Sequence, residues 1–414
     1  MTPQRIGLSL AAAAAAALAP TALPALELTA GEWKFTFSGN VNAHYIYSSC
    51  EDEPVAITGG LACVAAGGED SSSSISNGLL PAALSLSAST TQGGYDIGVT
   101  FGLYPGISTN DTGSPNLQDS NTGALNTALG TTSMDVRQVF LTFGNDRMGQ
   151  FKLGRDLGLF QADAILFDMT IPGVGSGNGN YATPANTSLG SIGLGYIYAD
   201  WFAQINYTTP DINGFKFTIG IFDPLEPLVQ SLSGVNVPEP TPGIHGKISY
   251  TRDNWYFSAS FLTMEHEGAT DASDFDSFGF DIGGKVTFQG LEVMAYYYDA
   301  EGIGTTGLFV FSDDGLGGER DSDGFIAQVT YTFGGSGAGS TKVGVNYGES
   351  NLDLAPGEIN PTLVKKNSKY TVGVYHNLTE NLTLLAEFSD TRAKAQNGLK
   401  NDSSNFNIGA FVSF

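Results

Sequence analysis

The sequence has little charge, and very little positive charge. Its 414 residues include 18 Lys and Arg against 42 Asp and Glu, and charged residues make up 14% of the chain, whereas about 25% is usual in soluble domains. The net charge of −24 argues against a nucleic-acid partner, which calls for clustered Lys and Arg. No internal apolar run is long enough for a membrane helix. With 41% hydrophobic residues, the chain is also too apolar for acidic disorder.

Cysteine is scarce as well, since Cys50 and Cys63 are the only two. They lie close together in a stretch rich in Gly, Ser and acidic residues. In an exported protein the surroundings are oxidising, so we expect a disulfide that closes this loop. The alternatives are two unpaired thiols or a zinc site, and the absence of a nearby His disfavours zinc.

Residues 1–25 have the features of a secretory signal peptide. Arg5 supplies a positive start, residues 6–18 are apolar and mostly Ala, and Ala25 is a plausible cleavage position. The alternative is an Ala-rich membrane anchor. Cleavage would remove one base and no acid, which leaves residues 26–414 one unit more negative than the full chain.

An alternation of apolar and polar side chains recurs throughout residues 26–414. Its first run extends from Trp33 to Tyr47, and its last run ends at Phe414. A period of two places apolar side chains on one face of a strand and polar side chains on the other. In the first run the polar face carries Asn42 and His44, which favour water, while the aromatic face favours hydrocarbon.

Short and long connections between these runs alternate. The seven short connections are 92–94, 145–149, 211–214, 252–254, 289–290, 334–340 and 377–381. The eight long connections are 48–77, 105–133, 156–198, 223–243, 264–274, 300–322, 350–366 and 390–404. Fifteen connections join sixteen strands, and short turns at one end with long loops at the other are typical of an outer-membrane barrel.

The sequence therefore predicts an all-β protein, a sixteen-stranded antiparallel transmembrane β-barrel over residues 26–414. A sheet in lipid must close on itself to pair every backbone group, and sixteen strands enclose a water-filled channel. The alternative is a secreted soluble β-protein, but no short fixed repeat supports a β-solenoid.

Three stretches resemble the Gram-negative general-diffusion porin family. Residues 143–160 resemble the family's strand before its constriction loop, because Phe143-Gly144 precedes Gly154-Arg155 at the family's spacing. Residues 205–217 are similar to the family's hairpin "Y-x-S-P-x-x-x-G-F". The C-terminal strand, which ends at Phe414 with apolar residues at every second position, is the third.

The resemblance implies a homotrimer of barrels in the outer membrane of a Gram-negative bacterium, in contact with outer-membrane lipid and lipopolysaccharide. It implies that a third loop, about 156–198, folds inward and narrows each pore. The composition supports this loop independently, since it is the longest connection and is rich in Gly. The resemblance also implies that Phe414, Val412 and Phe406 belong to the signal that the barrel-assembly machinery recognises.

Five residues are candidates for the pore constriction: Arg155, Asp163, Asp168, Asn40 and Asp200. Arg155 matches a basic wall residue of the family, and the two loop acids match its acidic side. Asn40 and Asp200 stand where many members place bases, so we expect the basic half of the constriction to be depleted. Alternatively, Arg155 anchors the loop by pairing with one of the loop acids, and these acids are merely solvated.

Catalytic and metal motifs are missing. The four histidines fall at no metal-ligand spacing, and neither a nucleophile elbow nor a P-loop occurs. Residues 321–324 are similar to half of a calcium loop but lack its Glu, so a solvated loop is the simpler interpretation. We expect no enzyme activity and no cofactor. Divalent ions that bridge the acidic loops to lipopolysaccharide phosphates are an open alternative.

The predicted function is passive diffusion of small hydrophilic solutes and ions with a preference for cations. The acid excess favours cations, and residues 161–187 contain two acids and no base. Asp163→Asn or Asp168→Asn should weaken the preference, and Arg155→Ala should strengthen it. The alternatives are a porin selective for a sugar or carboxylate, and a secreted or surface β-rich binding protein. Tyr296 and Tyr298, in the polar register of one strand, indicate either an aromatic sugar path or an interface girdle.

Overall fold

The computed structural model describes residues 26–51, 55–63, 70–107, 134–177, 187–228 and 237–414, together with the backbone of 114–118 and 128–130. The predicted signal peptide lies outside these residues and stays a prediction. Among the described residues, no helix is long and apolar enough to cross a membrane.

Nearly all the described secondary structure is β. The strands are β1 Leu26–Ala30, β2 Trp33–Cys50, β3 Ser71–Ser76, β4 Ala83–Gln92, β5 Tyr95–Pro105, β6 Ser114–Gln118, β7 Ala128–Gly130, β8 Met134–Asn145, β9 Gly149–Leu157, β10 Trp201–Thr208, β11 Phe215–Phe222, β12 Gly243–Arg252, β13 Trp255–His266, β14 Phe275–Phe288, β15 Leu291–Glu301, β16 Asp321–Phe333, β17 Thr341–Leu352, β18 Val364–Asn377, β19 Leu382–Ala395 and β20 Lys400–Ser413. One short helix, α2 Ala162–Phe167, and one 3-10 turn, Asp271–Ser273, complete the described elements.

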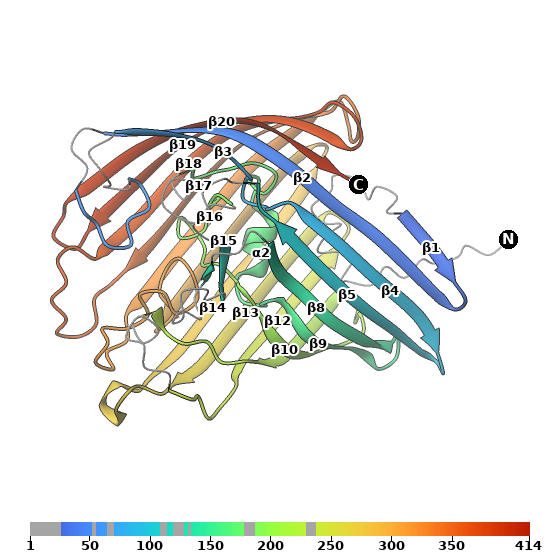
Figure 1. Ribbon diagram of the computed structural model, residues 1–414, viewed down its shortest axis with the longest axis horizontal. Helices are drawn as coiled ribbons and strands as arrows, with labels where there is room; N and C mark the ends of the chain where they lie inside the picture. Colours follow the sequence, from blue (N-terminus) through green and yellow to red (C-terminus); the bar gives the residue numbers. More distant parts are fainter. Residues whose placement is uncertain are drawn as a thin grey trace.

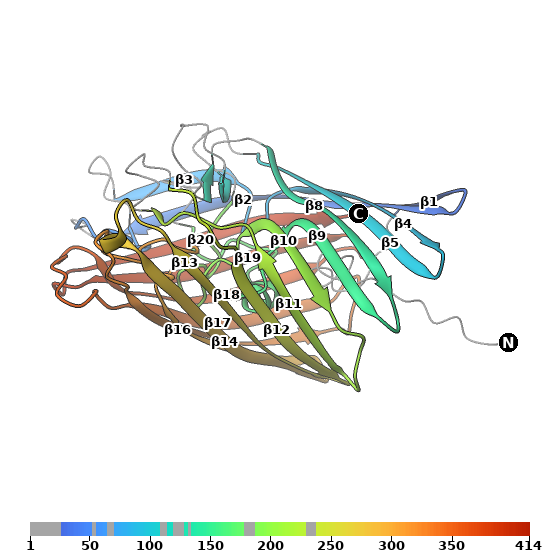
Figure 2. The same ribbon diagram turned by 90° about the horizontal axis from the view of Figure 1, so that it is seen from below.

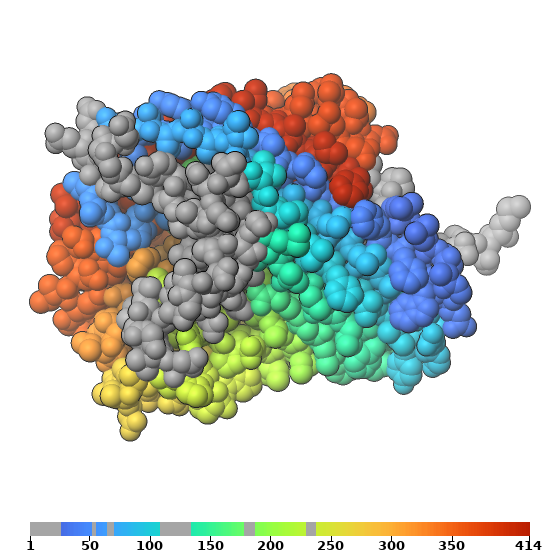
Figure 3. Space-filling view, viewed as in Figure 1, coloured from blue at the N-terminus to red at the C-terminus, as the bar shows by residue number. Residues whose placement is uncertain are grey.

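The strands form one closed antiparallel barrel (Figure 1). From β8 to β20 each strand pairs with its sequence neighbours. Earlier in the chain, β5 pairs with β4 and β8, β2 pairs with both β3 and β4, and β6 and β7 form a separate two-stranded sheet. The barrel closes where β20 pairs with β2 from Asn40↔Ser413 to Cys50↔Ser403, so that β2 (blue) lies beside β20 (red) (Figure 3). The sheet contains 18 strands. Because β3 and β4 share one edge of β2 while β1 and β20 share the other, the wall is sixteen strands around. The predicted fold is confirmed.

The alternation of side chains has the predicted meaning, with an apolar outside and a polar inside. On β2, Val41 and Tyr45 are 53% and 45% exposed on the outer face, whereas the intervening Asn42 and His44 are 2% and 1% exposed. On β20, Phe406 and Ile408 lie outside and Asn405 and Asn407 inside. An apolar exterior is what a wall in contact with lipid chains requires.

The two ends of the barrel differ as predicted. Figure 2 shows short turns at the end near the C-terminus and longer connections at the other. All seven predicted short turns join strands. Several long connections are shorter than predicted or contain a strand. The connection 390–404 is mostly strand, since β19 ends at Ala395 and β20 begins at Lys400. The connection 48–77 contains β3, which pairs with the upper part of β2.

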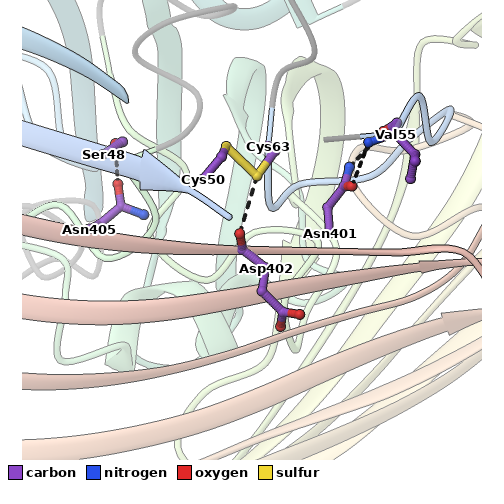
Figure 4. The surroundings of a disulfide bond; sticks show 7 residues. All are labelled: Ser48, Cys50, Val55, Cys63, Asn401, Asp402 and Asn405. Atoms are coloured by element: carbon purple, nitrogen blue, oxygen red, sulfur yellow. Dashed lines mark hydrogen bonds between the residues drawn. A yellow bond between two sulfur atoms is a disulfide. The ribbon is translucent and has the colours of Figure 1, made fainter. Parts of the chain in front are cut away.

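Cys50 and Cys63 form the predicted disulfide, with their Cα atoms 5.7 Å apart (Figure 4). The bond joins the end of β2 to the following loop. The Cys63 sulfur lies 3.3 Å from the Asp402 carbonyl oxygen on β20. Val55 donates a backbone hydrogen bond to Asn401 Oδ1 at 2.9 Å. The first loop is thereby held against the seam where the barrel closes.

Phe414 lies where the C-terminal strand meets the first one. Its backbone exchanges hydrogen bonds with Gly39 at 2.9 and 3.0 Å, and its ring packs 6.2 Å from that of Phe37. Phe414 and Val412 are exposed on the outer face at the end with short turns, whereas Phe406 lies at mid-strand. Their role in assembly stays a prediction.

Phe414→Ser is expected to lower the amount of assembled barrel in the outer membrane, because it removes the terminal aromatic group at the seam. Quantitative blotting of the folded, heat-modifiable form measures this amount, and Phe388→Ser, a similarly exposed aromatic away from the terminus, is the control. Equal assembly of the two variants would contradict the predicted signal.

Candidate pore constriction

The connection between β9 and β10, residues 158–200, carries α2 inside the barrel (Figure 1). Side chains of the inner register hold its backbone at several places, among them Asp281, Gln328 and Glu387. Asp281 of β14 accepts the Gln161 N–H at 2.8 Å. Gln328 of β16 accepts the Met169 N–H at 2.8 Å and donates to the Phe167 carbonyl at 2.6 Å. Glu387 of β19 provides the third attachment.

Glu387 is 2% exposed and binds the loop through one oxygen. Its Oε2 accepts the N–H groups of Val174 and Gly175, both at 2.8 Å, and Tyr375 donates to Oε1 at 2.6 Å. Gly175 has a φ of +59°, which turns two successive N–H groups toward one acceptor. A Cβ on Gly173 would lie 2.1 Å from Glu387 Oε1, so the loop approaches the wall this closely only with Gly there.

Asp163, a predicted constriction residue, lies in α2 and forms an ion pair with the wall. Lys247 Nζ of β12 is 3.0 Å from Asp163 Oδ1, and Tyr256 of β13 donates to Oδ2 at 2.8 Å. Burial alone would raise the pKa of Asp163, but Lys247 and the Tyr256 hydroxyl lower it below the ordinary value. The carboxylate is therefore ionised at neutral pH, and its charge is largely compensated by Lys247.

Asp168, at the end of α2, is 3% exposed and hydrogen-bonded on both oxygens. Tyr196 donates to Oδ2 at 2.9 Å, while Thr170 N–H and Asn346 Nδ2 donate to Oδ1 at 2.9 and 3.2 Å. Nearby, Lys369 of β18 donates to the Gly190 carbonyl at 2.7 Å. Asp168 therefore ties the outgoing and returning halves of the loop to each other and to β17.

Arg155 and Asp200 lie near each other at the base of the loop, where the Asp200 carbonyl accepts the Gly158 N–H at 2.9 Å. Arg155 pairs across strands with Val139 and Ala203, which belong to the exposed outer register. Asp200 is 2% exposed, and its Oδ1 accepts the Trp201 N–H at 2.6 Å. Burial raises the pKa of Asp200 to about 7, although the Trp201 N–H and Arg155 act in the opposite direction.

Asn40, the fifth predicted residue, lies on the inner face of β2, half-buried, where it accepts a hydrogen bond from Asn42 Nδ2 at 3.2 Å. The five predicted residues therefore occupy three places: Asp163 and Asp168 on the loop inside the barrel, Arg155 and Asp200 at the loop's base, and Asn40 on β2. Their roles in a constriction stay predictions.

The basic groups near the loop come from the wall, and sequence reasoning missed most of them. Besides Lys247, Lys285 of β14 lies 4.0 Å from the centroid of the Phe167 ring and 3.6 Å from Glu292. Lys342 of β17 lies 4.7 Å from the centroid of the Tyr375 ring. The alternation of apolar and polar residues could have identified these three lysines as facing inward, because all of them occupy polar positions of their strands.

Tyr296 and Tyr298 face the interior, where they are 3% and 0% exposed. The interface-girdle interpretation is therefore wrong. Tyr296 bonds to Ser258 at 2.9 Å and belongs to an apolar cluster that includes Ile165 of α2. The outward tyrosine of this strand is Tyr297, which is 42% exposed.

A second connection also enters the barrel. Residues of the segment between β15 and β16, namely Ile303, Leu308 and Phe309, are buried in a cluster with Phe160 and Ile197 of the third loop. The Thr306 carbonyl accepts the Tyr198 N–H at 2.9 Å. The sequence predicted this connection only as an external loop, so the loop-filled part of the lumen is larger than expected.

These features accompany a clear family relationship. A sequence model of the Gram-negative porins matches residues 7–396. The chain therefore belongs to the Gram-negative porin family and is a channel protein of the outer membrane. No curated protein matches the sequence significantly.

Solved structures share the fold at low sequence identity. The outer membrane channel DcaP of Acinetobacter baumannii aligns with a TM-score of 0.68 at 14% identity, over 95% of this chain and 100% of that one. An anion-selective porin from Comamonas acidovorans gives 0.61 at 16%, over 92% and 100%. The trimer form of OmpT from Vibrio cholerae gives 0.53 at 13%, over 92% and 99%.

Proposed function

We propose that the barrel is a water-filled pore for passive diffusion of small hydrophilic solutes and ions, narrowed by residues 158–200 and weakly cation-preferring. The observation that carries the proposal is the attachment of this connection to the inner register of β12, β14, β16, β17 and β19. A segment fixed at so many points inside a barrel sets the size of the remaining passage. No reaction is part of this function.

The charges around α2 largely cancel one another, which argues for only a weak preference for cations. The pairs Asp163–Lys247 and Lys285–Glu292 contribute little net field. The acid excess of the chain lies mainly in the long connections and the strand ends beside them, as in the segments 265–276 and 313–323. The electric field of these acids raises the local cation concentration at the end of the barrel with long connections. The effect weakens as the salt concentration rises.

A carboxylate-selective porin is the second candidate, and Lys342 is the observation that favours it. Its ammonium is on the inner register beside Tyr375, and no ion pair within 4.0 Å involves it among the described residues. An unpaired cation beside the passage would attract anions.

We infer a homotrimer as the assembly, which the trimer form of the structurally similar OmpT supports. A folded porin trimer resists detergent until boiled, so its migration on a denaturing gel should depend on heating.

Zero-current potentials across a planar bilayer under a potassium chloride gradient test the function. We expect the conductance to rise in steps as several pores open. The zero-current potential should have the sign of a cation-selective channel at low salt, and its magnitude should decline at high salt. An anion-selective sign would reject the cation preference and favour the second candidate. Absence of any conductance from heat-modifiable protein would reject the diffusion pore itself.

A further inference from the structure

Residues 55–63 of the first loop lie across the inner face of β18, β19 and β20, at the end of the barrel with long connections. Val55 and Asn401 of β20 exchange two hydrogen bonds, at 2.9 and 2.8 Å (Figure 4). Asn367 of β18 accepts the Leu61 N–H and donates to a carbonyl of the same segment, both at 3.0 Å. Asn401 and Asn367 are 6% and 1% exposed and belong to the inner register. The segment therefore covers the inner wall on this side of the entrance.

The middle of the segment contacts two other connections. The Thr58 N–H donates to the Thr362 carbonyl, and the Thr58 carbonyl accepts the Val364 N–H, at 2.9 and 2.8 Å. A Cβ on Gly59 would lie 2.7 Å from the Phe311 ring, in the connection between β15 and β16. Gly59 also has a φ of +77°, a conformation that glycine adopts without strain. The segment therefore fits closely beside the connection that enters the lumen, and it does so only with Gly at this position.

The disulfide holds residues 55–63 in this place. It fixes Cys63, at the end of the segment, to Cys50 at the end of β2. A disulfide that closes a loop of this length favours the closed arrangement about 100-fold in the chain-entropy model. The other attachments are hydrogen bonds and the packing of Ile57 against Leu363 and Val364. The disulfide differs from them in that a reductant removes it.

The wall below the segment is polar and favours water. The hydroxyls of Thr391 and Ser403, the Asn405 amide nitrogen and the Asn407 amide oxygen are buried with no hydrogen-bond partner among the described residues. Ser403 lies directly opposite Thr391, and positions 403, 405 and 407 follow one another on the inner face of β20. Buried polar groups without partners are unfavourable, and water can supply the partners. Hydration of this wall therefore offsets part of the free energy needed to lift the segment.

We propose that residues 55–63 are a lid over the side of the pore entrance lined by β18–β20, that the Cys50–Cys63 disulfide holds the lid shut, and that a dithiol reductant opens it. The dithiol transfers two electrons and two protons to the protein. The sulfur–sulfur bond breaks, both cysteines become thiols, and the reductant forms its own cyclic disulfide. Reducing surroundings outside the cell would thereby widen the entrance. The proposal rests on the proposed diffusion pore, which the oxidised protein tests by itself.

The test compares the oxidised full-length folded protein with the same protein reduced by dithiothreitol. Hydrogen–deuterium exchange, measured by mass spectrometry, follows the backbone N–H groups of Val55, Thr58 and Leu61, which are hydrogen-bonded in the closed lid. Reduction is expected to speed their exchange about 100-fold. In planar bilayers, dithiothreitol added on the side of the long connections should raise the single-channel conductance, and reoxidation should reverse the rise.

Two variants separate the lid from the disulfide. Cys50→Ser/Cys63→Ser should behave like the reduced protein and should not respond to dithiothreitol. Asn367→Ala keeps the disulfide but removes two hydrogen bonds to the lid, so its exchange and conductance should lie between those of the oxidised and reduced protein. The matched control is Asn351→Ala, because the Asn351 side chain donates to Asp323 of β16. Heat-modifiable migration shows that each variant is folded, and reduction of assembled wild-type protein provides the test if the serine variant does not assemble.

Unchanged exchange at residues 55–63, after thiol labelling has shown complete reduction, would overturn the proposal. Faster exchange without a rise in conductance would also overturn it, because the segment would then cover no part of the passage. An equal rise in conductance for Asn351→Ala and Asn367→Ala would reject the contacts at Asn367 as those of a lid. These outcomes are measured on protein whose oxidised form conducts, so they differ from failure of the pore function, which is absence of conductance in both forms.

Discussion

Glu387→Ala is expected to release the third loop from the far wall and to raise the single-channel conductance. The substitution leaves the Val174 and Gly175 N–H groups without their acceptor. An unpaired buried donor costs about 1–3 kcal/mol, so the loss of two weakens the attachment by about 2–6 kcal/mol. The ratio of detached to attached loop then rises by a factor of about 30 to 20,000. Planar-bilayer recordings should show larger and noisier open-channel currents.

Glu387→Gln is the matched control, because its carbonyl oxygen can still accept both N–H groups at the same place. Its conductance and noise should stay near the wild-type values, although Tyr375 loses a charged acceptor. Wild-type conductance for the alanine variant would mean that the remaining attachments at Asp281 and Gln328 suffice. That result would reject Glu387 as the residue that holds the loop.

Asp163→Asn is expected to reduce cation preference mainly by leaving Lys247 unpaired. At about 8 Å and an effective dielectric constant of about 40, one unit charge changes the energy of a monovalent ion by about 1 kcal/mol. That corresponds to about a fivefold change in local ion concentration, and it should decline as salt rises. Zero-current potentials at low salt measure the shift.

The double-mutant cycle at this pair makes the test specific. Lys247→Gln should increase cation preference, since it leaves the Asp163 carboxylate unpaired, and Asp163→Asn/Lys247→Gln should return close to the wild-type potential. Asp168→Asn is the contrasting variant, because its charge is surrounded by hydrogen bonds from Tyr196, Thr170 and Asn346. A shift in the same direction for both single variants of the Asp163–Lys247 pair would exclude compensation within the pair.

The strands of the barrel could be predicted from the sequence because the geometry of a strand depends on neighbouring residues. A period of two requires only neighbouring residues, so the alternation around Asn42 and His44 on β2 predicted which side chains face inward. The lengths of the turns predicted the direction of each strand and the number around the barrel. The disulfide followed from the proximity of Cys50 and Cys63 and from export, and the structure confirms it.

The contacts between the wall and the loop inside the barrel could not be predicted in this way. The alternation predicts that Lys247 and Glu387 face inward. It does not predict how far along the barrel axis each side chain lies or which residue of the loop it contacts. Asp163 and Lys247 are 84 residues apart, and Gly175 and Glu387 are 212 apart. The sequence resemblance assigned the acids of the third loop to a pore field, whereas the structure pairs Asp163 with Lys247 and encloses Asp168 in hydrogen bonds.

The sequence alone therefore determined the barrel, the inward and outward faces of its strands, and the position of the acid excess, because each depends on residues close together in the chain. Tertiary structure alone decided which charges near the third loop are compensated, that a second connection carrying Ile303 and Phe309 enters the lumen, and that residues 55–63 lie against the inner face of β18–β20. These features depend on how far each strand is shifted against its neighbour and on where loops cross the interior. Both are settled only when the sheet closes, since closure fixes the height of every side chain at once.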